Sequence, residues 1–140
     1  MMGKRAASLV LLSVVAAAIA ACSQPTAPKG DPNVMPARYK DEIIDALRTI
    51  FSKNETSSIT NAMITDPVLR PVGSEQHYVV CVRYTAHGTV YNLTANAERI
   101  AYFYAGRLNQ LVEADKEQCG NAAYKPFPEL DKVCIGTGCK

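Results

Sequence analysis

The sequence has no tryptophan, only two histidines, no C-x-x-C pair and no G-x-S-x-G segment. The missing C-x-x-C pair argues against a thioredoxin-like dithiol, and the missing G-x-S-x-G segment argues against a serine-hydrolase nucleophile elbow. The glycine pair in Gly136-Thr137-Gly138 is too close to the C-terminus for the helix that a phosphate-binding loop requires. We therefore expect a protein that is not an enzyme, with no catalytic residue, no bound metal and no cofactor.

A basic excess is also lacking, which argues against a nucleic-acid partner. The chain carries 15 Lys and Arg against 13 Asp and Glu. Two of the basic residues, Lys4 and Arg5, lie in a segment that we expect to be removed, so that the charges of the remaining chain balance. A protein that neutralises nucleic-acid phosphates needs a basic excess or a basic stripe.

The N-terminus has the form of an export signal. Lys4 and Arg5 precede an uncharged apolar run at residues 6–21, AASLVLLSVVAAAIAA. This run is shorter than the roughly 20 residues that a transmembrane helix needs. A basic head, an apolar body and a small-residue exit together indicate a secretory signal peptide.

The exit of this segment, Ile19-Ala20-Ala21-Cys22, resembles the bacterial lipobox. In proteins with this motif the cysteine sulfur receives a diacylglyceryl group, and cleavage leaves the cysteine as the first residue. The resemblance implies lipidation of Cys22 and a periplasm-facing place in the cell envelope, anchored to a membrane. Ser23, where inner-membrane lipoproteins carry Asp, favours the outer membrane. An ordinary signal peptide with a chance cysteine, or an uncleaved anchor, is the alternative.

The mature chain divides into a tether, a domain and a tail. Residues 23–37 hold four of the eight prolines, and proline interrupts both helix and sheet, so this segment is predicted to stay extended. With 140 residues the chain has room for one small domain. The predicted organisation is a signal peptide at 1–21, a lipidated cysteine and tether at 22–37, a domain at 38–131 and a tail at 132–140.

Hydrophobic periodicity predicts one helix at the start of the domain and strands after it. The helix runs from about Arg38 to Asn54, with apolar residues at helical spacing: Tyr39, Ile43, Ala46, Leu47, Ile50 and Phe51. Strands are predicted at 59–65, 78–86, 100–104 and 108–112, with a loop at Pro67 and Pro71 and a tight turn at Ala105–Arg107. From about Cys119 onward we expect irregular structure. The expected fold class is α+β, with one N-terminal amphipathic helix on a small antiparallel sheet of three or four strands, stapled by disulfides.

Four cysteines remain once Cys22 is assigned to lipid, and an even number in an exported chain indicates two disulfides. Three pairings are possible. We favour Cys81–Cys119, because Cys119 follows the last predicted strand closely enough to fold back over the central one. We also favour Cys134–Cys139, because the two glycines between them permit a tight loop. A metal site or a redox-active thiol is the alternative.

The remaining polar residues are interpreted as surface. His77 and His87 flank the strongest predicted strand, and neither has an apparent partner that would make it a general base. Glu113, Asp115 and Glu117 lack the pattern of a calcium loop and are expected to form a solvated edge. Sheet packing explains most of the tyrosines, with an interaction surface as the alternative.

Three segments resemble small lipoproteins that are common in alphaproteobacteria, especially in rhizobial lineages: PVGSEQHYVVCVRY, IAYFYAGRLNQLVEA and CGNAAYKPFPEL. The likeness covers residues 38–131 and the lipobox. Two cysteines recur in such proteins, here Cys81 and Cys119, as does Tyr-x-Pro-Phe-Pro-Glu-Leu, here Tyr124 to Leu130. The tail with its two cysteines departs from the pattern. The resemblance implies the same location and fold, and it implies no mechanism.

An anchor, a tether and a small domain without a catalytic motif indicate a non-enzymatic envelope lipoprotein. We expect it to act as a protein-interaction or structural module, with the membrane and an envelope protein as its partners. A periplasmic inhibitor or small-ligand-binding lipoprotein is the alternative function.

The intact mass of the protein extracted from membranes tests the anchor and the disulfides together. We expect loss of residues 1–21, an added lipid mass on Cys22 and four thiols that become available to alkylation only after reduction. A mass that retains residues 1–21, or thiols that react without reduction, would contradict the export and lipidation of this chain.

Overall fold

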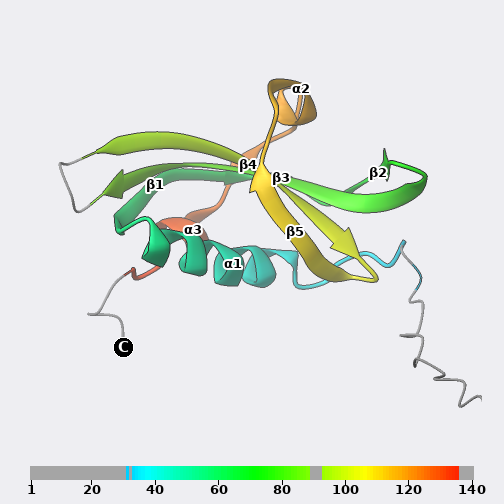
Figure 1. Cartoon of the computed structure of the whole chain (residues 1–140), viewed down its shortest axis with the longest axis horizontal. Helices are drawn as coiled ribbons and strands as arrows, with labels where there is room; N and C mark the ends of the chain where they lie inside the picture. The colour runs from blue at the N-terminus through cyan, green and yellow to red at the C-terminus, as the bar shows by residue number, and fades with distance from the viewer. Residues whose placement is uncertain (1–30, 32, 89–92, 136–140) are drawn as a thin grey trace, which may run out of the picture.

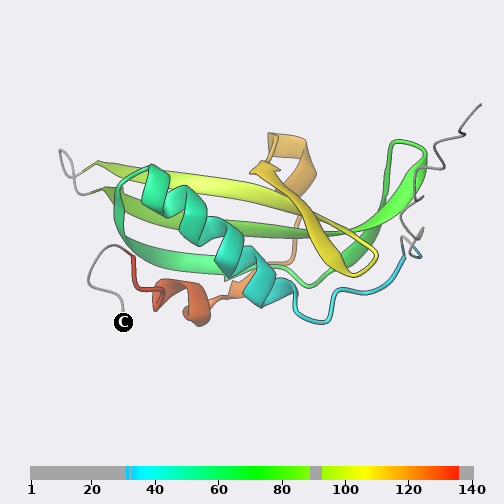
Figure 2. The same ribbon diagram turned by 60° about the horizontal axis from the view of Figure 1, so that its bottom comes forward.

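The structure is a computed structural model that describes residues 31, 33–88 and 93–135. Within these residues the chain forms a six-stranded antiparallel sheet, with one long helix lying across one face (Figure 1, Figure 2). No helix of the described part has the length and apolarity that crossing a membrane requires. The elements in chain order are α1 (Tyr39–Lys53), β1 (Thr56–Ile64), β2 (Val68–Val72), β3 (Glu75–Gly88), β4 (Thr94–Tyr104), β5 (Arg107–Glu113), α2 (Lys116–Cys119), β6 (Lys125–Pro126) and α3 (Pro128–Asp131).

The predicted fold class, α+β with a sheet of three or four strands, is wrong. Strand makes up 48% of the structure and helix 23%, so the protein is dominated by its sheet. The order of the strands is β5-β4-β3-β1-β6, and β2 also pairs with β3. Strand β2 was not predicted because it contains Pro71, and proline indicates a loop in most sequences. Among the described residues β2 pairs with β3 alone, and proline is tolerated in such an edge strand. The polar first half of β4 has few β-forming residues and becomes a strand by pairing with β3.

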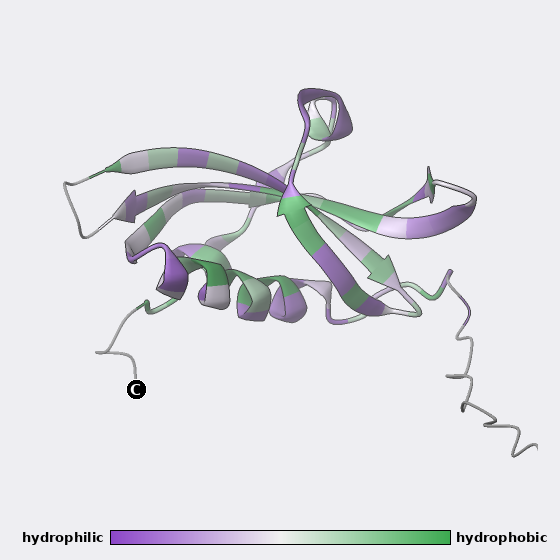
Figure 3. Ribbon diagram, in the orientation of Figure 1, coloured by the Kyte–Doolittle hydropathy of each residue, from purple (hydrophilic) through white to green (hydrophobic). Residues whose placement is uncertain are grey.

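The predicted N-terminal helix is confirmed, and its apolar stripe forms the main core. Ile43, Leu47 and Phe51 are buried on the side of α1 that faces the sheet. They pack with side chains of the inner face of the sheet, as we name the face that α1 covers, and Figure 3 shows the resulting bands of hydropathy along α1. Phe127 and Leu130, from the C-terminal segment, complete this core.

Strand β3 is the centre of the sheet. It is longer than predicted and pairs with β4 along one edge, from Tyr78↔Phe103 to His87↔Thr94. Its other edge pairs with β1 and then with β2, which run in the same direction, one after the other. Every other strand except β5 and β6 is therefore placed by its register against β3.

A short interruption separates β1 from β2 at Thr65-Asp66-Pro67. The backbone N–H of Thr65 donates to the carbonyl of Cys81 at 2.9 Å, and the N–H of Cys81 donates to the Thr65 hydroxyl at 3.0 Å. The buried Thr65 hydroxyl thus accepts the Cys81 N–H in place of a backbone carbonyl of the ladder. As a result Asp66 projects to the surface.

The predicted turn between β4 and β5 is confirmed. Ala105 and Gly106 have φ values of 50° and 75°, the left-handed pair that a two-residue hairpin turn requires. Val34 lies against this turn, because a Cβ added to Gly106 would come within 3.0 Å of its Cγ1. Pro36 is fully buried. The last residues of the predicted tether therefore reach the domain at the β4–β5 turn.

The predicted Cys81–Cys119 disulfide is present, with 6.0 Å between the two Cα atoms. It lies on the outer face of the sheet, opposite α1, in a second small core with Val79 and Ile100. The segment that includes α2 is thereby fastened to the centre of β3. Cys134 also takes part in a disulfide, and Cys139, its predicted partner, lies outside the described residues.

Replacing both Cys81 and Cys119 with alanine is expected to lower the free energy of unfolding by about 4 kcal/mol. This is the chain-entropy value for a loop of 38 residues. Equilibrium urea unfolding of the oxidised proteins measures the difference, with circular dichroism to check that the variant is folded. A loss below about 1 kcal/mol would mean that packing alone holds the α2 segment on the sheet.

Candidate functional site

Strand β5 is shorter than β4 and leaves the first residues of β4 uncovered at the border of the sheet. Glu113 at the end of β5 pairs with Arg99, and the next residue, Ala114, donates its N–H to the Glu98 carbonyl at 3.0 Å. Strand β4 extends beyond this point to Thr94. Among the described residues, Thr94–Ala97 has no strand beside it on that side, as Figure 2 shows at the outer border of the sheet. We call these four residues the β4 edge.

A groove of about 430 Å³ lies beside the β4 edge, on the inner face. Ile50 and Phe51, near the end of α1, line one side of it, and the first half of β4 lines the other. Tyr84 and Ala86 of β3 contribute further apolar surface, and Leu93 lies at its rim with 65% of its surface exposed. We call this feature the edge groove. It is a largely apolar hollow next to unpaired backbone.

The edge groove holds one cation, Arg99. Its side chain is 13% exposed, and its Nε donates to the Tyr84 hydroxyl at 3.0 Å. Its nearest carboxylate, that of Glu113, lies 3.8 Å from Nη2 and is 87% exposed. An ion pair with so exposed a partner is weak. Arg99 is thus a largely desolvated cation whose charge is compensated mainly by a neutral hydroxyl and a solvated carboxylate.

A second hollow, of about 570 Å³, lies on the outer face beyond the disulfide. The guanidinium of Arg83 stacks over the Tyr124 ring, 4.3 Å from the centroid, and the Tyr124 hydroxyl donates to Glu98 at 2.5 Å. Burial, and then the hydrogen bond to Glu98, raise the pKa of Tyr124 far above its usual value. The phenol therefore stays protonated. The Thr85 hydroxyl donates to the Asn96 side-chain carbonyl at 2.9 Å. The polar side chains of this surface thus bond largely to one another.

Of the two histidines predicted to lie at the surface, His87 lies at the exposed end of β3, whereas His77 differs from its predicted place. His77 is not a surface residue, because its side chain is 13% exposed and its Nδ1 lies 3.2 Å from the Phe103 carbonyl. His87 lies in the outer face between the hydroxyls of Thr60 and Thr94, at 2.9 Å and 3.2 Å. The two rings occupy separate positions along β3 and bond to a carbonyl and to hydroxyls, respectively.

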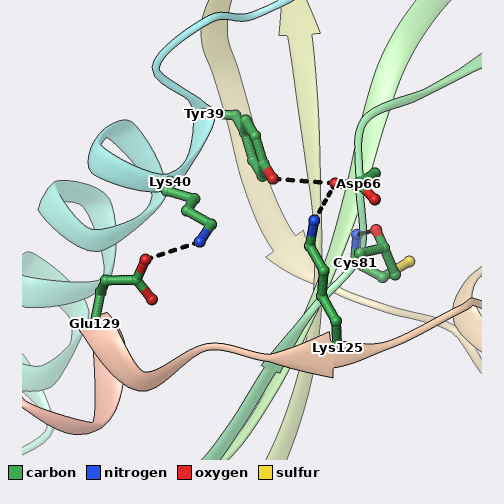
Figure 4. Close-up of polar contacts among 7 residues, drawn as sticks. Tyr39, Lys40, Asp66, Cys81, Lys125 and Glu129 are labelled. Atoms are coloured by element: carbon green, nitrogen blue, oxygen red, sulfur yellow. Dashed lines mark hydrogen bonds and ion pairs between the residues drawn. The ribbon is translucent and has the colours of Figure 1, made fainter.

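A polar cluster fastens the C-terminal segment to the start of α1 (Figure 4). Asp66, pushed outward by the interruption after β1, forms an ion pair with Lys125 and accepts a hydrogen bond from the Tyr39 hydroxyl at 3.4 Å. Lys40 bonds to Glu129 at 2.8 Å and also lies over the Phe127 ring. These contacts join α1 to α3 directly and to β6 through Asp66.

The charges in this cluster shift one another's ionisation. The hydrogen bond from Lys125 lowers the pKa of the Asp66 carboxyl, and the same bond raises the pKa of Lys125. The hydrogen bond from Lys40 lowers the pKa of Glu129. Asp66, Lys125 and Glu129 therefore keep their charges near neutral pH.

Among the described residues, the predicted site residues that the structure brings together are the two cysteines of the disulfide. Cys81 and Cys119 are joined in the core of the outer face, whereas Cys22 and Cys139 lie outside the described residues. In the part that the structure describes, no three His, Cys, Asp or Glu side chains are grouped to hold a metal ion. The edge groove was not predicted, because its residues come from α1, β3, β4 and β5, and no local motif joins them.

Comparison of the chain with protein-family models, with curated proteins and with solved structures finds no match.

Replacing Asp66 with asparagine is expected to lower the urea midpoint at pH 7 and to lower it less, or not at all, at about pH 2. Because the pKa of Asp66 is lowered by folding, the pair with Lys125 stabilises the protein above the ordinary carboxyl pKa. That stabilisation is lost as the pH falls through the lowered value. Unfolding of Glu117→Gln, an exposed carboxyl on α2, is the control at both pH values. An Asp66→Asn effect of equal size at both would contradict the assignment.

Proposed function

We propose that this chain is a lipid-anchored protein of the bacterial cell envelope that acts as a non-enzymatic docking module for another envelope protein. The lipobox-like sequence at Ile19–Cys22 supports the anchor, and the proline-rich segment after it supports a tether. Two or three acyl chains on Cys22 would hold the domain at the membrane, since each buried CH2 contributes about 0.8 kcal/mol.

The observation that carries the proposal is the position of the edge groove relative to the tether. The tether meets the domain beside Gly106, at the β4–β5 turn. The edge groove lies along the opposite half of β4, a strand of 11 residues. At a rise of roughly 3.3 Å per residue, Thr94 is about 30 Å from the turn. A domain held by that tether would present the groove at its far end, where a partner in the periplasm has access to it.

The alternative function, a periplasmic inhibitor or small-ligand-binding lipoprotein, fits the shape of the edge groove less well. A small-ligand site encloses most of its ligand in a concave pocket and orients it with a few convergent polar groups. The edge groove is bordered by unpaired backbone, and the charged residues that line it, Glu98, Arg99 and Glu113, lie at the end nearest to β5. Such a surface is better matched to a polypeptide than to a small molecule.

Photo-crosslinking in cells that naturally carry the protein tests the docking function. A photoreactive residue replaces in turn three exposed apolar side chains of the full chain: Leu93 beside the edge groove, Val68 in β2 and Val112 in β5. We expect a reproducible adduct with a distinct envelope protein from at least one position, and its loss in a Cys22→Ala variant that leaves the membrane fraction. Absence of adducts at all three positions would overturn the proposed function.

A further inference from the structure

We propose that the β4 edge accepts an added β-strand. The strand would be an extended segment of the partner protein, with an apolar side chain that enters the edge groove and an acidic side chain that meets Arg99. This inference rests on the proposed docking function and specifies its site. It follows from the backbone groups at the edge, from the groove behind them and from the charge inside it.

The backbone of the β4 edge is arranged to bond a strand. The Glu98 carbonyl points away from β3, because it accepts the N–H of Ala114. In an antiparallel sheet the backbone groups of alternate residues point to the same side. Those of Asn96 and Thr94 therefore point outward as well. Among the described residues no strand bonds to them, so they continue the row of groups that β5 uses farther along β4.

The β4 edge also lacks the features by which proteins protect exposed strand edges, such as proline, charge or a bulge. Its sequence is Thr-Ala-Asn-Ala. The borders formed by β2, β6 and β5 have such protection. Strand β2 carries Pro71, and β6 consists of Lys125 and Pro126. In β5 the N–H of Leu108 donates to the Glu42 carboxylate of α1 at 2.5 Å.

A strand added in line with β5 would place alternate side chains on the inner face, where the edge groove lies. Ile50, Phe51 and Tyr84 form an apolar surface in the groove, against which an apolar side chain of the added strand would pack. Arg99, at the end of the groove nearest to β5, offers a cation with a weak partner. The chemistry that fits this site is therefore an extended segment with an apolar residue and an aspartate or glutamate on the same face.

A second copy of this chain fits less well. Pairing of two β4 edges about Asn96 would bring Arg99 opposite position 93 of the other copy, which is a leucine. The edge itself carries no acidic residue for Arg99 to meet.

Two variants of Asn96 separate strand addition from recognition of side chains. Asn96→Pro removes the outward N–H and is expected to fold, because proline is tolerated on an edge strand where its N–H would face solvent. Asn96→Ala keeps the N–H. Both variants lose the same side-chain bond to Thr85, so that loss cancels in the comparison. Thermal unfolding of the two proteins checks that both remain folded.

The readout is the adduct formed in cells by the full chain with the photoreactive residue at position 93. We expect Asn96→Pro to reduce the adduct at least tenfold relative to Asn96→Ala. Arg99→Gln should also reduce it, whereas Glu113→Gln, which removes the competing carboxylate, should not. Mass spectrometry of the adduct should identify a partner segment with an acidic residue in a β-forming run.

Each other outcome decides against the inference in a distinct way. Adducts from Val68 or Val112 without one from Leu93 would leave the docking function standing and overturn the β4 edge as its site. Equal adducts from Asn96→Pro and Asn96→Ala would exclude backbone pairing. An adduct between two copies of this chain would replace the partner strand with a homodimer. Absence of all adducts would overturn the docking function itself.

Discussion

The register of β3 against its neighbours is the constraint on which the other elements depend. Cys81, at the centre of β3, is fixed from three directions: it pairs with Ile100 of β4, bonds to the Thr65 hydroxyl and is joined to Cys119. Because side chains alternate along a strand, this one register sends Val80 and Val82 to the core under α1 and sends Cys81 to the opposite face. A slip by one residue would exchange the two faces and place the disulfide in the wrong layer.

The candidate site results from a mismatch in strand length imposed on that register. Strand β4 has 11 residues and ends at the turn of Ala105 and Gly106, and β5, which begins after this turn, has 7. The four residues that β5 leaves uncovered lie next to the end of α1, so the unpaired backbone and the edge groove occur together. The part of β4 that pairs with β5 lies near the tether, and the unpaired part lies away from it.

Two different devices hold the C-terminal segment after β5. The disulfide fastens α2 to the outer face, where a covalent link offsets the small area of the second core. Farther on, Phe127 and Leu130 enter the main core, and the ion pairs of Asp66 with Lys125 and of Lys40 with Glu129 lie over this contact at the surface. The segment predicted to be irregular is thus ordered by contacts to residues far away in the sequence.

The sequence by itself determined the features that short-range patterns encode. The stripe of Ile43, Leu47 and Phe51 predicted α1, and Ala105-Gly106 predicted the hairpin turn, because side-chain period and positive φ are local properties. The predicted disulfide between Cys81 and Cys119, one of three possible pairings, is confirmed. The lipid anchor on Cys22 likewise depends on a local motif and remains a prediction.

Only the tertiary structure decided the extent of the sheet and the place of the site. Thr94–Ala97 and Val68–Val72 have weak strand signals, and each becomes a strand because β3 offers a partner for its backbone. The edge groove joins Phe51, Tyr84 and Arg99, whose proximity follows from packing and register. Residues so distant in the sequence share no local pattern, so chain order alone contains no signal that they meet.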